Sequence, residues 1–439
     1  MGLTRAVPTG VARRTQAKRR PSTAYRLMDL TDLMRTLAGQ IVPRSLMALA
    51  AVVIGLGIGP VGAQELVMPP TPEVPPLAPP APREGMFRLG SFNFFPRARA
   101  SVAYDDNVFL DENDRVDDVV WGLRPGITII SSDLSTNGGK ALTLTYDPNF
   151  LIYTDESDRS SINHSAAISA SLAFTKLSLG LSQTVSSTEY PVVEAGTLTD
   201  RLELGTMLNA RYAFGEKLSA DVGFGLRIVD YADRYGSWDW SNRNWVNYQY
   251  SERLGVGVGL VLGYIDMDGS ADQNYEDLLV RAIFHAAEKL QLNATVGLDW
   301  RQYRSGVDDT LAPIWDVAAV YRPQERTALS LGLYQRYYSS AYYGDQNYLS
   351  TGVNAGVRHE FLTRYVFSIN ARYYRSDYEA TVVGAAPRAT DEVVAVRPDL
   401  SVRLKERWTA GIFYEFSHNA SDDRPYTRNY LGLQTGWVY

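Results

Sequence analysis

The feature that most constrains this chain is the strict alternation of residues 254–266. Every second side chain is large and apolar, and the positions between are nearly bare. The first set is Leu254, Val256, Val258, Leu260, Leu262 and Tyr264; the second is Gly255, Gly257, Gly259, Val261 and Gly263. A period of two predicts a strand rather than a helix. Its apolar face meets either a second sheet, as in a soluble sandwich, or lipid, as in a membrane barrel whose glycines face the lumen.

Repetition of this pattern decides between the two. From about Arg97 to Tyr439 amphipathic strands recur, and short turns alternate with longer, mostly acidic loops. The short turns are residues 174–176, 214–217, 287–289, 361–364 and 405–407, and the longer loops are 111–118, 155–158, 266–272, 308–309 and 421–425. Short turns at one end and long loops at the other are typical of an outer-membrane barrel with the short side in the periplasm.

The chain ends on an amphipathic strand. Leu431, Leu433, Thr435, Trp437 and Tyr439 alternate with Gly432, Gln434, Gly436 and Val438. A final strand that stops on an aromatic residue resembles the signal by which the barrel assembly machinery recognises its substrates. We therefore predict an all-β fold: a transmembrane antiparallel up-and-down β-barrel of about 18 strands (16–18). An even count places both termini in the periplasm, and the outer face contacts the lipid of the outer membrane of a Gram-negative bacterium.

The alternation also assigns a set of charged and aromatic residues to the lumen. We predict that the pore is lined by Arg124, Arg211, Arg227, Arg281, Arg301, Arg336, Arg358, Arg372, Arg397, Arg403, Glu203, Asp299, Glu360, Tyr334 and Tyr374. A charge that faced lipid at mid-bilayer would cost about 2–4 kcal/mol, which supports this assignment. For any one arginine two roles remain open: cross-strand pairing that stiffens the wall, or attraction of anionic solutes in a wide, wet channel.

The first 90 residues have a different character from the rest. Residues 1–63 combine a basic stretch, an apolar run over 46–58 and small residues at 61–63. This pattern predicts an export signal, with Gln64 as the first residue of the mature protein. Translation begins at Met1, Met28 or Met34. The alternative for this segment is a single anchor helix. Residues 64–90 are Pro-rich and predict a disordered periplasmic spacer. We assign residues 91–439 to the barrel.

Composition and motifs exclude several functions. The chain has no Cys, and therefore no disulfide and no thiolate metal site. Residues 1–63 hold nine of the 43 basic and two of the 49 acidic residues, which leaves 34 basic against 47 acidic and argues against a nucleic-acid partner. We find no catalytic, cofactor-binding or metal-binding motif, and His164, His359 and His418 face outward by parity. We expect neither an enzyme nor a cofactor.

Two short motifs carry a resemblance to a known family. They are residues 104–110, Tyr-Asp-Asp-Asn-Val-Phe-Leu, and residues 123–127, which contain Pro125-Gly126. They resemble the opening of the outer-membrane β-barrel porins often called β-barrel porin 2, loosely over residues 97–439. That resemblance implies a conduit without catalytic residues, encoded beside exopolysaccharide assembly machinery, that exports polymer with periplasmic export components as partners.

Three functions follow from these observations. The leading hypothesis is secretion of an exopolysaccharide through the lumen. The second is a general or anion-preferring diffusion porin for small solutes, and the third is a structural barrel that anchors the envelope. A diffusion porin usually folds a long loop into its lumen; no loop here is clearly long enough, and residues 191–199 and 382–389 are the nearest candidates.

Overall fold

The computed structural model describes residues 87–131, 139–192, 197–232, 235–287, 289–340 and 342–439. The predicted signal segment and most of the predicted spacer lie outside these residues. The strands are β1 (Phe87–Leu89), β2 (Phe92–Asp105), β3 (Asp118–Ser131), β4 (Lys140–Tyr146), β5 (Asn149–Tyr153), β6 (Ser161–Ala173), β7 (Leu177–Val192), β8 (Thr197–Ala213), β9 (Leu218–Tyr231), β10 (Ser237–Gln249), β11 (Leu254–Met267), β12 (Gln273–Ala287), β13 (Leu290–Tyr303), β14 (Thr310–Gln324), β15 (Thr327–Ser339), β16 (Gln346–Phe361), β17 (Tyr365–Ala380), β18 (Asp391–Lys405), β19 (Trp408–Asn419) and β20 (Tyr426–Val438), with one short 3₁₀ helix, Ser157–Arg159.

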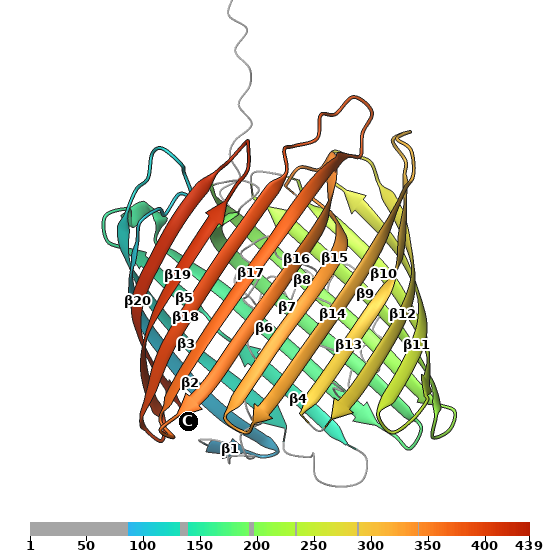
Figure 1. Ribbon diagram of the computed structural model, residues 1–439, viewed down its shortest axis with the longest axis horizontal. Helices are drawn as coiled ribbons and strands as arrows, with labels where there is room; N and C mark the ends of the chain where they lie inside the picture. Colours follow the sequence, from blue (N-terminus) through green and yellow to red (C-terminus); the bar gives the residue numbers. More distant parts are fainter. Residues whose placement is uncertain (1–86, 132–138, 193–196, 233–234, 288, 341) are drawn as a thin grey trace, which may run out of the picture. The chain divides into compact units, whose positions relative to one another are not determined.

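These strands form one antiparallel sheet that closes on itself (Figure 1). Each wall strand pairs with the next along the chain, and β2 pairs with β20 from Arg97↔Val438 to Asp105↔Tyr430 to complete the barrel. Closure removes both sheet edges, which is what allows a sheet to cross lipid. No helix among the described residues is long and apolar enough to span a membrane.

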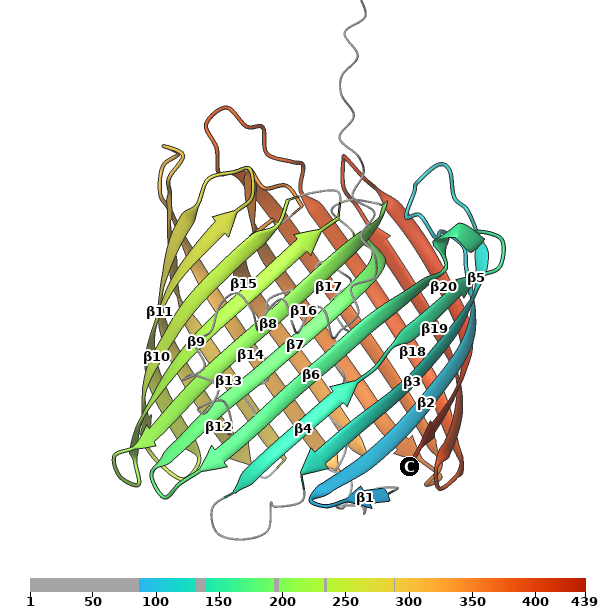
Figure 2. The same cartoon turned by 180° about the vertical axis from the view of Figure 1, so that it is seen from behind.

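The wall has 18 strands because two of the twenty are not independent wall strands. β4 and β5 both pair with β3 and β6 in one continuous register, and Figure 2 shows them in line. Asp147-Pro148 separates them, opposite Pro125-Gly126 of β3 by that register. Two facing prolines supply no N–H, so the ladder is interrupted there. β1 is a short strand that pairs only with the start of β2, over three residues at the end of the predicted spacer 64–90.

The side chains divide between the two faces as the alternation predicts. Exposed apolar residues cover the outside, for example Val258, Leu260 and Leu262 of β11, and their cross-strand partners Val280 and Leu278 of β12. A Cβ on Gly297, on the inner face, would lie 2.1 Å from the backbone oxygen of Leu278, so only glycine allows the local approach of β12 and β13. The short turns and Tyr439 lie at one end, where the Tyr439 amide donates to Pro96 O.

Three tyrosines near the long-loop end do not face lipid. Tyr231 and Tyr303 belong to the inner face by register, and Tyr231 is buried against Tyr342. Tyr337 is buried although its parity is outward. The described residues of the candidate loop 191–199 extend the β7–β8 hairpin, which is paired to Val192↔Thr197, and residues 193–196 lie outside the described residues.

Candidate channel and its constriction

The inner face carries every residue predicted for the lumen. The ladder places them there because directly opposite residues share a face: Arg124 is opposite Arg99, Arg211 opposite Asp221, and Arg397 opposite Asn370. Four of the fifteen nevertheless have little contact with solvent. Asp299, Arg301, Arg372 and Tyr374 are only 3–4% exposed, and they are packed under other inner-face groups rather than lining an open lumen.

One inner-face arginine region lies between mid-barrel and the short-turn end. Arg99 of β2 and Arg124 of β3 are direct cross-strand partners, both exposed, and neither makes an ion pair or hydrogen bond within the described part of the chain. Asp399 of β18 interacts electrostatically with Arg397, Arg99 and Arg358. We call Arg99, Arg124, Arg358 and Arg397 the lower arginine cluster.

The lower arginine cluster is not neutralised by its neighbours. Arg397 Nη1 donates to Glu415 Oε2 at 2.9 Å, and the Asp399 carboxylate accepts from Gln434 Nε2 at 2.6 Å. Two carboxylates therefore face four guanidinium groups. The Nε of Arg358 is buried and has no hydrogen-bond partner among the described residues. A cluster with excess positive charge in a confined lumen raises the local concentration of anions.

Other arginines of the lumen form ion pairs with carboxylates of the wall. Asp221 lies between Arg211, at 3.7 Å, and Arg281, at 2.6 Å, and the Arg281 guanidinium also stacks on Trp245. Glu203 accepts from Arg201 at 2.5 Å and from Arg227 at 2.8 Å. Arg211–Asp221 and Arg227–Glu203 join the neighbouring strands β8 and β9, which is the stiffening role that the sequence left open. Arg281 reaches Asp221 from β12, and Arg201 and Glu203 lie on one strand.

The remaining predicted residues have mixed surroundings. Arg336 pairs with Asp316 and lies over the Tyr334 ring, while Arg403 is exposed near the short turns and Glu360 is half-buried there. Tyr374 packs against Leu110, which reaches the inner wall from the loop between β2 and β3.

That loop is fastened by the motif at the end of β2. Asp105 accepts both Nε and Nη2 of Arg428, and Asp106 accepts the Asn429 amide at 2.6 Å. The Asn107 side chain bonds the backbone of Asp111 in both directions and donates to Thr427 O at 3.0 Å. The residues 105–107 thus tie the first loop to β20 across the closure of the barrel.

The constriction begins where the ladder between β14 and β15 opens. β14 and β15 pair as far as Trp315↔Gln335, and beyond this point no described residue of β14 pairs with β15. β15 stays paired with β16 to Ser339↔Asn347, and β16 stays paired with β17 to Gln346↔Ala380, so these strand ends lie together away from β14. We call residues 336–340 and 342–349 the inturned hairpin.

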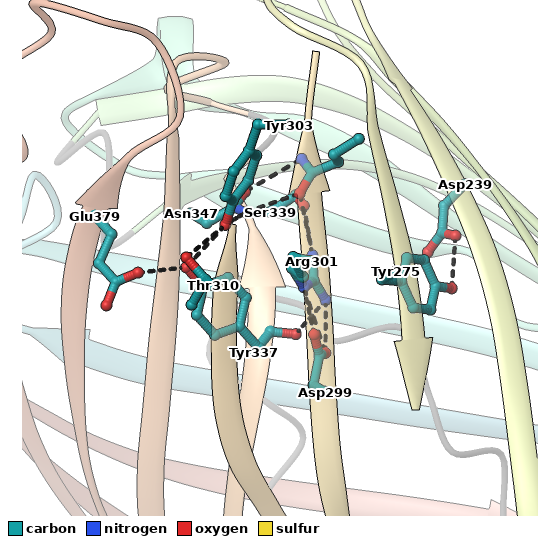
Figure 3. A network of polar contacts seen from close by, with 11 residues as sticks. Asp239, Tyr275, Asp299, Arg301, Tyr303, Thr310, Tyr337, Ser339, Asn347 and Glu379 are labelled. Carbon is teal, nitrogen blue, oxygen red and sulfur yellow. Dashed lines mark hydrogen bonds and ion pairs between the residues drawn. The ribbon is translucent and has the colours of Figure 1, made fainter. Parts of the chain in front are cut away.

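The inturned hairpin lies against the inner face of β12 and β13 (Figure 3). Arg301 of β13 donates Nη2 to Tyr337 O and Nη1 to Ser339 Oγ, each at 3.1 Å. Asn347 of β16 donates to Gln273 Oε1 of β12 at 2.8 Å. Gln273 and Asn347 are 1% and 0% exposed, so this interface is dry.

Arg301 anchors the interface because all its N–H groups have partners. Besides Tyr337 and Ser339, it donates Nε at 3.0 Å and Nη2 at 3.1 Å to Asp299, and Nη1 to Gln273 Oε1 at 3.3 Å. The guanidinium also lies 4.7 Å from the Tyr337 ring centroid and 5.0 Å from that of Tyr275.

The far end of the inturned hairpin crosses to other strands. Tyr342 forms a buried cluster with Val229 and Tyr231 of β9, its ring 6.0 Å from that of Tyr231. On its other side Tyr343 lies under the Arg388 guanidinium, in the loop between β17 and β18. Contacts from β9 to β18 therefore bridge the long-loop end and narrow the lumen.

Sequence reasoning missed this constriction. Of its two candidate loops, the described residues of 191–199 continue the β7–β8 hairpin. Residues 382–389 rise above the rim in Figure 1 and are held by the ion pair of Arg388 with Asp391. The inturned hairpin is a strand pair rather than a long loop. Its local signal is Pro313, which is exposed at the point where β15 departs and whose carbonyl is bonded by the Gln335 side chain. Arg99 was also missed, because its outward neighbours Ala98 and Ala100 make the alternation weak.

Comparisons with known proteins return structures alone. No family model and no curated protein matches the chain. Among solved structures, OpdK of Pseudomonas aeruginosa, titled an outer membrane protein, is 14% identical with a TM-score of 0.43, over 79% of this chain and 99% of that one. OccK9 (OpdG) of the same species is 13% identical with a TM-score of 0.44, over 79% and 98%. OccAB4 of Acinetobacter baumannii is 10% identical with a TM-score of 0.42, over 79% and 98%. At these values no property of those proteins is transferred to this chain.

Proposed function

We propose that this protein is an outer-membrane diffusion porin for small solutes that prefers anions. The observation that carries the proposal is the inturned hairpin, which bridges the long-loop end of the barrel from β9 to β18. A narrowed, rigidly held passage suits small solutes. A polymer in transit needs an unobstructed lumen along its whole path, so the geometry favours the diffusion reading over the exopolysaccharide reading that the motifs suggested.

The lower arginine cluster supplies the preference for anions. Arg99 and Arg124 have no ion-pair or hydrogen-bond partner within the described chain, and Asp399 and Glu415 offset only part of the surrounding charge. Unpaired charges in a pore wall attract counter-ions from both mouths, and their effect weakens as salt screens it. The arginines higher in the lumen are already bound to Asp221 or Glu203, so their guanidinium groups are less available to a passing anion.

The reversal potential across a planar bilayer tests the proposal. With purified protein and a KCl gradient, we expect the reversal potential to have the sign that chloride permeation sets. The double variant R99Q/R124Q should lower the chloride-to-potassium permeability ratio about two- to fivefold. This corresponds to about 0.2–0.5 kcal/mol for each charge, below the limit of about 1 kcal/mol at contact in water because salt screens the charges. R375Q is the matched control, because Arg375 is exposed on the outer parity of β17 and pairs with Asp377. A cation-selective wild type would overturn the anion assignment.

A further inference from the structure

The inturned hairpin leaves an unoccupied pairing edge in the wall. Residues 310–314 of β14 pair with β13 on one side, from Arg301↔Thr310 to Gly297↔Ile314. On the other side they have no ladder partner among the described residues of β15. Leu311 is 64% exposed, whereas the inward Ala312 is 5% exposed. Unpaired strand edges are costly in a membrane, because lipid offers no hydrogen bonds.

Proline explains why the two strands separate at this place. Pro313 O points towards β15, since Gln335 Nε2 donates to it at 2.7 Å. The nitrogen of the same residue faces the same side, and in proline it carries no hydrogen. Pairing with Tyr337 would therefore leave Tyr337 O without its ladder donor. In the structure Arg301 Nη2 supplies that donor instead, from the inner face of β13.

Apart from that missing donor, the register of β14 and β15 can be extended across the gap without a shift. Extension of Trp315↔Gln335 places Ile314 opposite Arg336, Pro313 opposite Tyr337, and Leu311 opposite Ser339. In that arrangement Tyr337 joins Leu311 and Pro313 on the lipid face. Its parity is outward already, although it is now 6% exposed behind the wall. A tyrosine near the rim of the lipid face suits the headgroup level.

We propose that residues 310–314 are a docking edge for residues 336–339 of the same chain, and that the barrel exchanges between two states. In the tucked state, seen here, the inturned hairpin rests on β12 and β13 and narrows the lumen. In the zipped state β15 completes the wall along β14, and the lumen is wide. The effect of this exchange on the lumen rests on the proposed channel function, whereas the cross-linking test below does not depend on that function.

Apart from the apolar contact of Tyr342 with Val229 and Tyr231, the contacts that hold the tucked state are polar. They are the bonds of Arg301 to Tyr337 O and Ser339, the Gln273–Asn347 pair, and the hydroxyl of Tyr337, which donates to Glu379 Oε2 at 2.6 Å and meets Tyr303 at 3.2 Å. In the zipped state, water or lipid headgroups can replace each of these polar partners. Buried polar contacts of this kind specify one arrangement more than they stabilise it, which suits a two-state element.

Disulfide trapping tests the zipped state directly, because the chain has no native cysteine. Leu311→Cys with Ser339→Cys should cross-link on mild oxidation only when the strands zip. Val317→Cys with Leu333→Cys is the matched control, since these outward residues are opposite each other in the structure. We expect both pairs to form disulfides, and only the first to raise single-channel conductance, reversibly with dithiothreitol.

A second variant tests whether the cross-link between residues 311 and 339 reports pairing of the two strands. Pro313→Val supplies the missing donor and should increase the rate of the 311–339 cross-link severalfold, whereas Pro398→Val, in the paired part of β18, should leave that rate unchanged. No cross-link between 311 and 339 while the control pair cross-links would overturn the inference. A protein that cross-links as expected but conducts no ions would instead overturn the proposed function.

Discussion

Removal of the Arg301 side chain is expected to be among the most destabilising single changes in the barrel. Arg301→Met leaves Asp299 buried at 4% exposure without its cation, and deprives Tyr337 O, Ser339 and Gln273 of their donor. Loss of one partner from a buried ion pair costs about 3–5 kcal/mol. We expect this loss in the free energy of unfolding, measured by tryptophan fluorescence in urea with protein refolded into lipid vesicles.

The chain offers a matched control for this experiment. Arg375 and Asp377 are also two residues apart on one strand and form an ion pair at 2.9 Å, but they are 49% and 47% exposed. Arg375→Met should cost less than about 1 kcal/mol, as exposed pairs do. The double variant D299L/R301M should recover much of the loss, because it leaves no unpaired charge. Equal costs for Arg301→Met and Arg375→Met would refute the argument that Arg301 is a buried anchor.

Three further outcomes follow from the described contacts. Gly297→Ala should destabilise the barrel by about 1–3 kcal/mol, because its Cβ would lie 2.1 Å from Leu278 O, whereas Gly332→Ala, with nothing nearer than 3.9 Å, should be close to neutral in the same urea titration. Leu110→Ala should cost about 2–4 kcal/mol through lost packing on Tyr374 and Val393, and should expose residues 106–117 to limited proteolysis; wild-type resistance in the variant would contradict this. The amides of Asp114 and Asn113 lower the pKa of the Asp111 carboxyl, so the order they give this loop is full above about pH 4 and is lost as pH falls through that lowered pKa. Protection of the Asn113 amide, measured relative to its intrinsic exchange rate at each pH, should fall on acidification; unchanged protection would count against this.

The wall of the barrel could be predicted from the sequence because alternation encodes it residue by residue. The face of Arg124, Arg211 or Leu260 follows from its position in the strand, and the count of 18 follows from the alternation of turns and loops. The interruption between β4 and β5 at Asp147-Pro148 was not predicted, because alternation assigns faces and does not show where the ladder of hydrogen bonds is broken.

The constriction could not be predicted because it depends on contacts between distant strands. Tyr337 has the outward parity of a lipid-facing residue, and only its position against Arg301 of β13 reveals that its strand has left the wall. The same holds for burial: Arg301 and Arg124 follow the same pattern in sequence, yet one is an anchor and the other is exposed. Parity assigns a face, whereas packing across the lumen decides whether that face meets solvent.

Exclusion of neutral polymers from the pore tests the central claim most directly. Single-channel conductance is measured in KCl with polyethylene glycols of increasing size added to both sides. A lumen narrowed by the inturned hairpin admits only the smallest polymers, so conductance should fall with these and recover with larger ones. Conductance that stays low with polymers of several kilodaltons would mean that these polymers enter freely. That result would contradict a lumen narrowed by the inturned hairpin and would favour a wide conduit for a polymer.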